Sequence, residues 1–201
     1  MKNKLWFKLL LLIFFLAGNL TANSRLVLLD ISTAPLPWND SRLYQKFEKM
    51  LTRDENIRVQ RTDNLPPSQL PFPHDRNNLD SLINWGLEMG GRYLLVVTVH
   101  SERLERHKSF NLPLIFHKYE TVGIIEGDWR LLDLQRQKTL VAESFNVKLN
   151  GPRIFQGSMD DNCHDADIHL TAVEKVNFFN RLEEKLTTEL VGRVRKHTGG
   201  R

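Results

Sequence analysis

The chain has 201 residues, which suits one domain with a sizeable hydrophobic core. Its 28 Lys and Arg and 24 Asp and Glu give a formal net charge of +4 at pH 7. Three of the lysines lie in the first eight residues, so the rest of the chain is close to neutral and predicts no binding to nucleic acid. The single cysteine, Cys163, excludes a disulfide within the chain.

The first 22 residues have the layout of a secretory signal peptide. Lysines precede the apolar run Leu9–Leu16, and small and polar residues follow it up to Ala22. The run is shorter than the roughly 20 apolar residues with which a helix crosses a bilayer. We therefore expect residues 1–22 to be removed and residues 23–201 to form a single periplasmic domain. The alternative is an uncleaved signal that anchors the protein in the membrane.

Strand and helix patterns alternate through the first half of the chain. Arg25–Ile31 is a short apolar run typical of a buried strand, and residues 43–53 carry apolar side chains at helical spacing. Asn56–Gln60 predicts a second strand, and residues 79–87 predict a second helix. Tyr93–Val99 is apolar on both faces, which is typical of a central strand. This order predicts an α/β domain with parallel pairing. The buried side of the second helix is expected to consist of Leu79, Leu82, Ile83 and Leu87.

The second half predicts an antiparallel hairpin and a closing helix. Thr121–Leu134 and Thr139–Leu149 alternate apolar and polar residues, with a short polar break between them. Gly151–Asp167 is polar and predicts a loop. Leu170–His197 predicts a long amphipathic helix, in which Val173 and Val176 belong to the apolar side. The expected fold is therefore α/β, with helices in layers on both sides of a mixed sheet, parallel in its first half and antiparallel in its second.

Two segments carry a resemblance to known domains. They are MGGRYLLVVTV, residues 89–99, and the hairpin WRLLDLQRQKTLVAESF, residues 129–145. In this order they resemble the small periplasmic α/β domains of the TolB amino-terminal type. The curli-secretion lipoproteins and the lipoprotein activators of penicillin-binding proteins share that general architecture, although this chain lacks their lipid-bearing cysteine. The comparable positions are Gly91, Leu132, Asp133 and Val141. The resemblance implies a non-catalytic envelope module that binds proteins or envelope polymers and has no catalytic residues to transfer.

The densest group of metal-ligating residue types lies between Asp160 and His169. Four aspartates, two histidines and one cysteine occur within these ten residues, and such donors suit zinc or another divalent cation. Their spacing matches no standard site, and acidic residues before a helix also serve as caps. A solvated loop and a metal site therefore remain alternatives. The ligands of such a site would be Cys163, His164, Asp165 and His169.

The segment from Glu102 to Tyr119 starts with charged residues and continues with apolar ones around Pro113. The proline predicts a loop, and an apolar stretch in a loop either folds back onto the core or contacts a partner. Basic residues beside it also suit a membrane periphery. The predicted contact surface consists of Phe110, Leu112, Leu114, Ile115, Phe116 and Tyr119, with Arg103 and Arg106 at its rim.

No nucleophile motif, phosphate-binding loop or dinucleotide fingerprint occurs in the sequence, so we expect neither enzyme activity nor a cofactor. The predicted function is that of an exported accessory protein that binds or helps to assemble envelope partners, which are proteins or polymers. One alternative is a metal-binding protein or metal-dependent enzyme that uses residues 160–169. The other is a structural subunit that assembles with itself into a homo-oligomer.

Overall fold

Five strands form one mixed sheet in a computed structural model that describes residues 25–33, 42–66, 71–112, 116–156 and 170–199. The strand order is β2-β1-β3-β4-β5. β1 pairs in parallel with β2 and β3, whereas β3, β4 and β5 pair antiparallel, as predicted. The predicted signal peptide, residues 1–22, lies outside the described residues. The strands are β1 (Arg25–Thr33), β2 (Ile57–Arg61), β3 (Tyr93–Leu112), β4 (Phe116–Asp133) and β5 (Lys138–Gln156).

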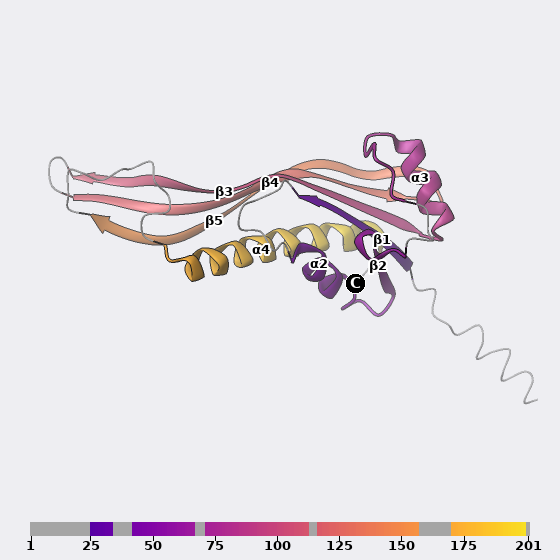
Figure 1. Cartoon of the computed structure of the whole chain (residues 1–201), viewed down its shortest axis with the longest axis horizontal. Helices are drawn as coiled ribbons and strands as arrows, with labels where there is room; N and C mark the ends of the chain where they lie inside the picture. Colours follow the sequence, from indigo (N-terminus) through magenta and orange to yellow (C-terminus); the bar gives the residue numbers. More distant parts are fainter. Residues whose placement is uncertain (1–24, 34–41, 67–70, 113–115, 157–169, 200–201) are drawn as a thin grey trace, which may run out of the picture.

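Helices cover both faces of the sheet, as Figure 1 shows. α2 (Leu43–Leu51) and α4 (Ala172–Thr198) pack on one face, and α3 (Leu79–Glu88) packs on the other. Alternate residues of a strand point to opposite faces, so Val27 and Leu29 contribute to the core under α2 and α4, whereas Leu28 contributes to the core under α3. The predicted three-layer α/β fold is confirmed.

Local signals in the sequence set the ends of the helices. Asn78 caps α3, because its side chain accepts a hydrogen bond from the backbone N–H of Ser81. Gly90 follows α3 with φ of +72°, a left-handed conformation that suits glycine. Thr171 and Glu174 form a reciprocal capping box at the start of α4. The ends of both helices therefore follow from short-range chemistry.

Four apolar residues that the helical spacing assigned to buried faces are exposed instead. Val173 is 69% exposed and Val176 is 52% exposed, because α4 buries side chains against the sheet only from Phe178 onward. Leu79 and Leu87 of α3 are also exposed, whereas Leu82 and Ile83 between them are buried. Helical spacing identifies the apolar side of a helix but not the part of its length that meets the core.

The largest departure from the sequence prediction is the length of the last three strands. β3 continues to Leu112 and β4 begins at Phe116, so Glu102–Tyr119 is mostly strand and not a loop. β5 continues to Gln156, so the prediction of a loop is wrong for residues 151–156, and residues 157–167 of that prediction lie outside the described residues. Pro113 falls between β3 and β4, where it interrupts neither strand.

These long strands form an extension, whose distal end projects beyond the helices (Figure 1). β1 pairs with β3 only from Tyr93 to Val99, and from Ser101 onward β4 is the one described strand beside β3. The extension is defined here as residues 101–112 of β3, 116–126 of β4 and 146–156 of β5. At its base, Ser101 pairs with Glu126 and Glu126 pairs with Asn146. It is a three-stranded sheet that the rest of the fold holds at one end.

Glycines allow close packing where the extension joins the α/β part. A bulge lies between Val99 and Ser101, and a Cβ on Gly127, opposite Val99, would lie 2.0 Å from the carbonyl oxygen of Thr98. A Cβ on Gly123 would lie 2.4 Å from the ring of Phe178 in α4. The packing at the base of the extension and its contact with α4 therefore require glycine at these two positions.

Candidate functional site

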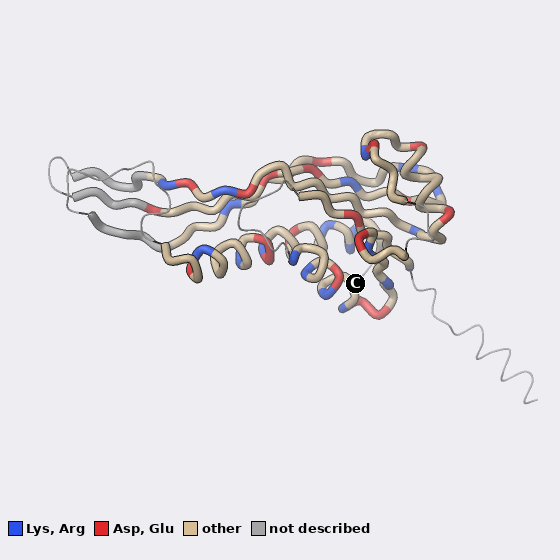
Figure 2. Tube along the Cα trace, in the orientation of Figure 1, with Lys and Arg blue, Asp and Glu red and all other residues tan. Residues whose placement is uncertain are grey.

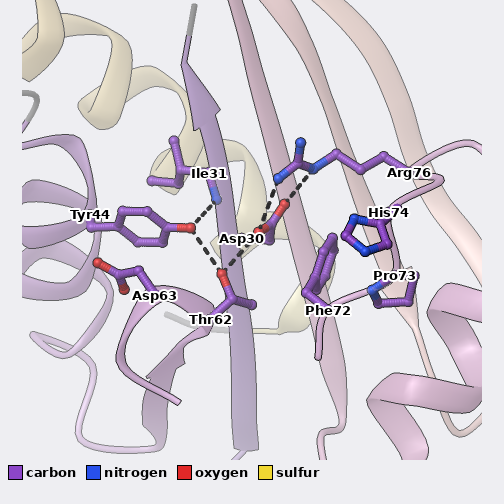
Figure 3. Close-up of a pocket in the computed structure, with 9 residues that line it drawn as sticks. All are labelled: Asp30, Ile31, Tyr44, Thr62, Asp63, Phe72, Pro73, His74 and Arg76. Carbon is purple, nitrogen blue, oxygen red and sulfur yellow. Dashed lines mark hydrogen bonds and ion pairs between the residues drawn. The ribbon is translucent and has the colours of Figure 1, made fainter. Parts of the chain in front are cut away.

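A polar pocket of about 320 Å³ opens at the carboxyl end of β1. The chain leaves β1 for β2 on one side and later returns as β3 on the other, so this end is a topological switch point. In α/β sheets, ligand sites occur preferentially at such points. Figure 3 shows the lining residues, which are Asp30, Ile31, Tyr44, Thr62, Asp63, Phe72, Pro73, His74 and Arg76.

A chain of hydrogen bonds crosses this pocket. The backbone N–H of Ile31 donates to the Tyr44 hydroxyl at 2.8 Å. The Thr62 hydroxyl donates to Asp30 Oδ1 at 2.9 Å, so it accepts from the Tyr44 hydroxyl, also at 2.9 Å. Burial is the main cause that raises the pKa of Tyr44 above its usual value, which keeps the phenol protonated and able to donate.

Arg76 provides the ion pair of the Asp30 carboxylate. Its Nε donates to Asp30 Oδ2 at 2.8 Å, and its guanidinium carbon lies 5.5 Å from the centre of the Phe72 ring. Asp30 is only 3% exposed, and both of its oxygens accept hydrogen bonds from Thr62 or Arg76. The Asp30 carboxylate therefore attaches two segments to β1. They are the turn after β2, which contains Thr62, and the segment before α3, which contains Arg76.

A second group of polar side chains lies on the same face of the sheet as α3, in a part that α3 does not cover. His100 Nε2 lies 2.6 Å from Asp128 Oδ2, and the Ser144 hydroxyl donates to Asp128 Oδ1 at 2.6 Å. The carboxylate separates the hydroxyl from the imidazole, whereas in a Ser-His-Asp triad the imidazole is the central member. This arrangement does not activate Ser144 as a nucleophile.

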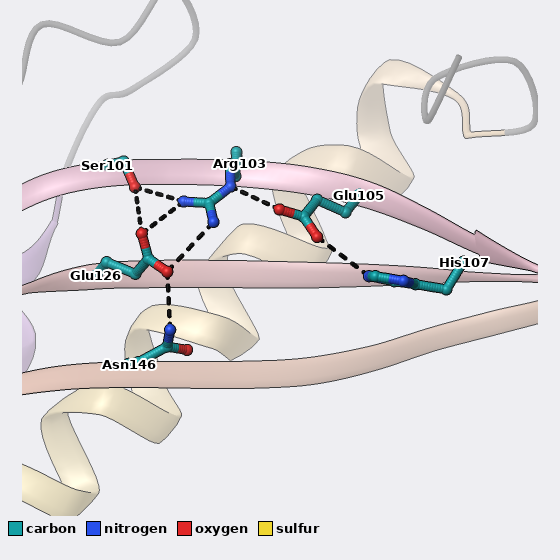
Figure 4. A network of polar contacts seen from close by, with 6 residues as sticks. All are labelled: Ser101, Arg103, Glu105, His107, Glu126 and Asn146. Atoms are coloured by element: carbon teal, nitrogen blue, oxygen red, sulfur yellow. Dashed lines mark hydrogen bonds and ion pairs between the residues drawn. The ribbon is translucent and has the colours of Figure 1, made fainter. Parts of the chain in front are cut away.

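A network of charges continues along the same face onto the extension (Figure 4). Arg103 donates to Glu126 at 2.7 Å and to Glu105 at 2.8 Å, and Asn146 donates to Glu126 at 2.7 Å. The Arg103 guanidinium lowers the pKa of Glu126 and of Glu105 below the usual value. Solvent-exposed ion pairs contribute little to stability, so the main consequence of the network is a surface of fixed positive and negative charges. Figure 2 shows charges of both signs along the described strands here.

The structure describes only part of the predicted contact surface. Arg103 belongs to the network just described, and Arg106 is a half-buried residue of β3. The strand register pairs Leu112 with Phe116, and Phe110 and Tyr119 also lie in the hairpin. The side chains of these four residues lie outside the description, as do Leu114 and Ile115 altogether. Their role as a contact surface stays a prediction.

The predicted metal ligands, Cys163, His164, Asp165 and His169, also lie outside the described residues. Within the described ranges, no three His, Cys, Asp or Glu side chains are placed to hold a metal ion. If residues 160–169 form a metal site, elemental analysis of the purified protein will give about one divalent cation per chain. Replacing His164 and His169 by alanine should then remove it, whereas His107→Ala, outside the segment, should not. A metal content near zero in the parent protein would exclude the site.

Sequence reasoning assigned none of Tyr44, Thr62 and Arg76 to a site. Tyr44 comes from the connection between β1 and β2, whereas Thr62 and Arg76 come from the connection between β2 and β3, and the parallel register brings them together. The available signal was topological, since polar residues that follow two parallel strands meet at one edge of the sheet. The Arg103 network was missed because its segment was predicted as a loop.

No protein-family model matches the sequence, and no curated protein matches it either. A solved structure described as a putative neuraminyllactose-binding hemagglutinin homolog from Helicobacter pylori is similar in fold. It has 12% identity and a TM-score of 0.51, and the match covers 88% of this chain and 89% of that one. A minor lipoprotein from Acinetobacter baumannii has 10% identity and a TM-score of 0.45, over 87% and 95% of the two chains.

TolB from Acinetobacter baumannii matches less completely. It has 16% identity and a TM-score of 0.36, and the match covers 62% of this chain and 23% of that one. The resemblance is therefore shown for the general α/β architecture alone, and the TolB type specifically is not shown. Among the described helices, none combines the length and the apolar character that a membrane span requires.

Proposed function

We propose that this chain is an exported, non-catalytic accessory protein of the cell envelope, which binds an envelope partner through the extension. The observation that carries the proposal is the extension itself. β3, β4 and β5 have 20, 18 and 19 residues, far beyond the typical length of about five or six. Only seven residues of β3 are paired with β1, so most of that length serves something other than the central sheet.

The edges of the extension favour a binding role. In the described part of the chain, no strand lies beside Ser101–Leu112 on the side away from β4, and none lies beyond β5. Open edges present backbone N–H and C=O groups that pair readily with other chains, and proteins usually keep such edges short. An extended segment of a partner can add to such an edge through main-chain hydrogen bonds.

The chemistry along the extension agrees with this role. The Arg103 network supplies polar groups near its base, and the sequence supplies apolar residues from Phe110 to Phe116 at its distal end. A protein interface commonly has an apolar centre and a polar rim. The proposed contact surface is therefore the predicted one, with Arg103 and Arg106 at the rim.

The two described polar groups support binding over catalysis. The Asp30 carboxylate is engaged by Thr62 and Arg76, and the Asp128 carboxylate is engaged by Ser144 and His100. A general base needs a free acceptor within reach of a substrate proton. The proposal that the protein is exported rests on the signal-like layout of residues 1–22, and the proposed compartment is the periplasm.

The test is affinity capture from an envelope extract after mild crosslinking, read by mass spectrometry. The double variant Leu114→Asp/Phe116→Asp should lose the partner at least tenfold while its circular dichroism stays that of the parent protein. The matched control is Val173→Asp/Val176→Asp, which makes the same chemical change at two exposed apolar residues of α4. This control should retain the partner.

Two outcomes would contradict the proposal. One is equal capture by both double variants, which would remove the distal hairpin from the interface. The other is unfolding of the Leu114/Phe116 variant, which would show that these residues belong to the core. If the captured protein is a second copy of the chain, the self-assembling subunit replaces the accessory role.

A further inference from the structure

The pocket at the carboxyl end of β1 lies where β2 stops pairing with β1. β2 pairs with β1 only as far as Leu29, whereas β3 pairs with β1 to its last residue, Thr33. The residues that follow this point on β1 and after β2 line the pocket, and they are Asp30, Ile31, Thr62 and Asp63. Its volume of about 320 Å³ falls within the usual range of small-ligand sites, roughly 300–1,000 Å³. The space beside the last residues of β1 is therefore large enough for a ligand.

Arg76 brings unused hydrogen-bond donors to this pocket. Its Nε and Nη2 face the Asp30 carboxylate, at 2.8 and 3.5 Å, as Figure 3 shows. Among the described residues, none accepts a hydrogen bond from Nη1, which lies on the side of the guanidinium away from Asp30. Because Asp30 is almost fully buried, the ion pair holds the guanidinium in one orientation. The pocket thus contains an oriented donor group that a ligand can use.

The two carboxylates of the lining keep free acceptor positions. Both oxygens of Asp63 accept hydrogen bonds from Arg61, at 3.0 and 2.6 Å. The oxygens of Asp30 accept from Thr62 and Arg76. An ionised carboxylate has about four lone-pair sites, so each aspartate can accept further hydrogen bonds. A ligand in the pocket therefore meets donors on Arg76 and acceptors on both aspartates.

The charges around the pocket favour a neutral ligand. The charged side chains form two ion pairs, Arg61 with Asp63 and Arg76 with Asp30. An anion would lie close to two carboxylates, and a cation would lie close to the guanidinium of Arg76. A hydroxyl group carries no charge, and it can accept from a guanidinium while it donates to a carboxylate. The pocket therefore suits a ligand with several hydroxyl groups and no charge.

We propose that this pocket binds a neutral sugar ring, whose hydroxyl groups accept from Arg76 and donate to Asp30 and Asp63. Phe72 and Pro73 line the same pocket and supply the apolar surface against which the C–H groups of the ring pack. Ligand sites commonly combine such an apolar wall with a few fixed polar groups. The proposal does not depend on what the extension binds.

NMR titration of the ¹⁵N-labelled full chain with methyl glucoside, methyl galactoside and methyl mannoside tests this proposal. At least one of these neutral sugars should bind with a Kd of about 1 mM, which is typical of a ligand of this size. The amide signals of residues 30–31, 62–63 and 72–76 should shift, whereas those of residues 101–107 in the extension should not. Signals that shift only outside the pocket would overturn the proposal, as would no binding at ten times that concentration.

Charged analogues of the same ring test the charge argument. The methyl uronide is an anion and the 2-amino glycoside is a cation, and each should bind at least tenfold more weakly than the neutral sugar. If either charged analogue binds more tightly than every neutral sugar, the pocket is not a site for a neutral sugar and the proposal is wrong.

Arg76→Lys tests the role of the guanidinium without removing the positive charge beside Asp30. Lysine lacks the planar pair of donors, so the affinity for the sugar should fall at least tenfold. Arg136→Lys is the matched control, because Arg136 also faces a buried aspartate, Asp133, and does not line the pocket. Equal affinity of the parent protein and Arg76→Lys would contradict the proposal. If Arg76→Lys does not fold, the amide shifts of the parent protein decide alone.

Discussion

Gly127→Ala is expected to destabilise the protein by about 3 kcal/mol or more. The added methyl group would lie 2.0 Å from the carbonyl oxygen of Thr98 and 2.6 Å from the ring of Phe145. The first of these contacts is with backbone, which cannot rotate away as a side chain can. Because Gly127 lies opposite the bulge, the strands must separate where the extension begins. Urea unfolding followed by circular dichroism measures the loss.

Gly192→Ala is the matched control for this substitution. Gly192 lies inside α4, and a Cβ there would have no atom within 4 Å. Alanine is the better helix former, so this variant should be stabilised by roughly 0.5–1 kcal/mol. If Gly127→Ala lowers the free energy of unfolding no more than Gly192→Ala does, the close packing of β3 and β4 at the base of the extension is contradicted.

Arg76→Ala is expected to destabilise the protein by about 2 kcal/mol, because it leaves the buried Asp30 carboxylate without its cation. The loss is smaller than for a fully buried pair, since the Arg76 side chain is 36% exposed. Thr62 still donates to Asp30, so part of the polar chain in the pocket survives. Chemical denaturation at neutral pH measures the difference.

Arg136→Ala provides the comparison for Arg76. Arg136 also faces a buried aspartate, Asp133, but at 3.9 Å and with a side chain that is 76% exposed. Its loss should cost less than about 0.5 kcal/mol. The double variant Arg76→Ala/Asp30→Asn should recover part of the stability that Arg76→Ala loses, because no buried charge remains unpaired. Equal losses for the two arginine variants would mean that the pocket does not hold β1 to its neighbours.

The sequence predicted the α/β order because the signals for it are local. Apolar runs mark β1 and the start of β3, Asn78 marks the start of α3, and Gly90 marks its end. The mixed pairing follows from the same order, since helices between strands favour parallel neighbours and a short turn favours antiparallel ones.

The extension could not be predicted in the same way. The β3 part of the extension carries charged residues such as Arg103 on a face that none of the described helices covers, so the apolar alternation that identifies a half-buried strand is weak there. Pro113 suggested a break, although it falls between two strands. The pocket at β1 was missed for another reason, because its residues come together only through strand register and the paths of the connections.

Site-specific photo-crosslinking tests most directly whether the extension is the part of the molecule that binds the partner. A photoreactive amino acid can replace exposed His107 on the extension or exposed Arg53 after α2 in the α/β part. After irradiation in an envelope extract, the protein labelled at position 107 should form one dominant adduct, and the protein labelled at position 53 should form none. An adduct from position 53 alone, or the same adduct from both positions, would contradict the central claim.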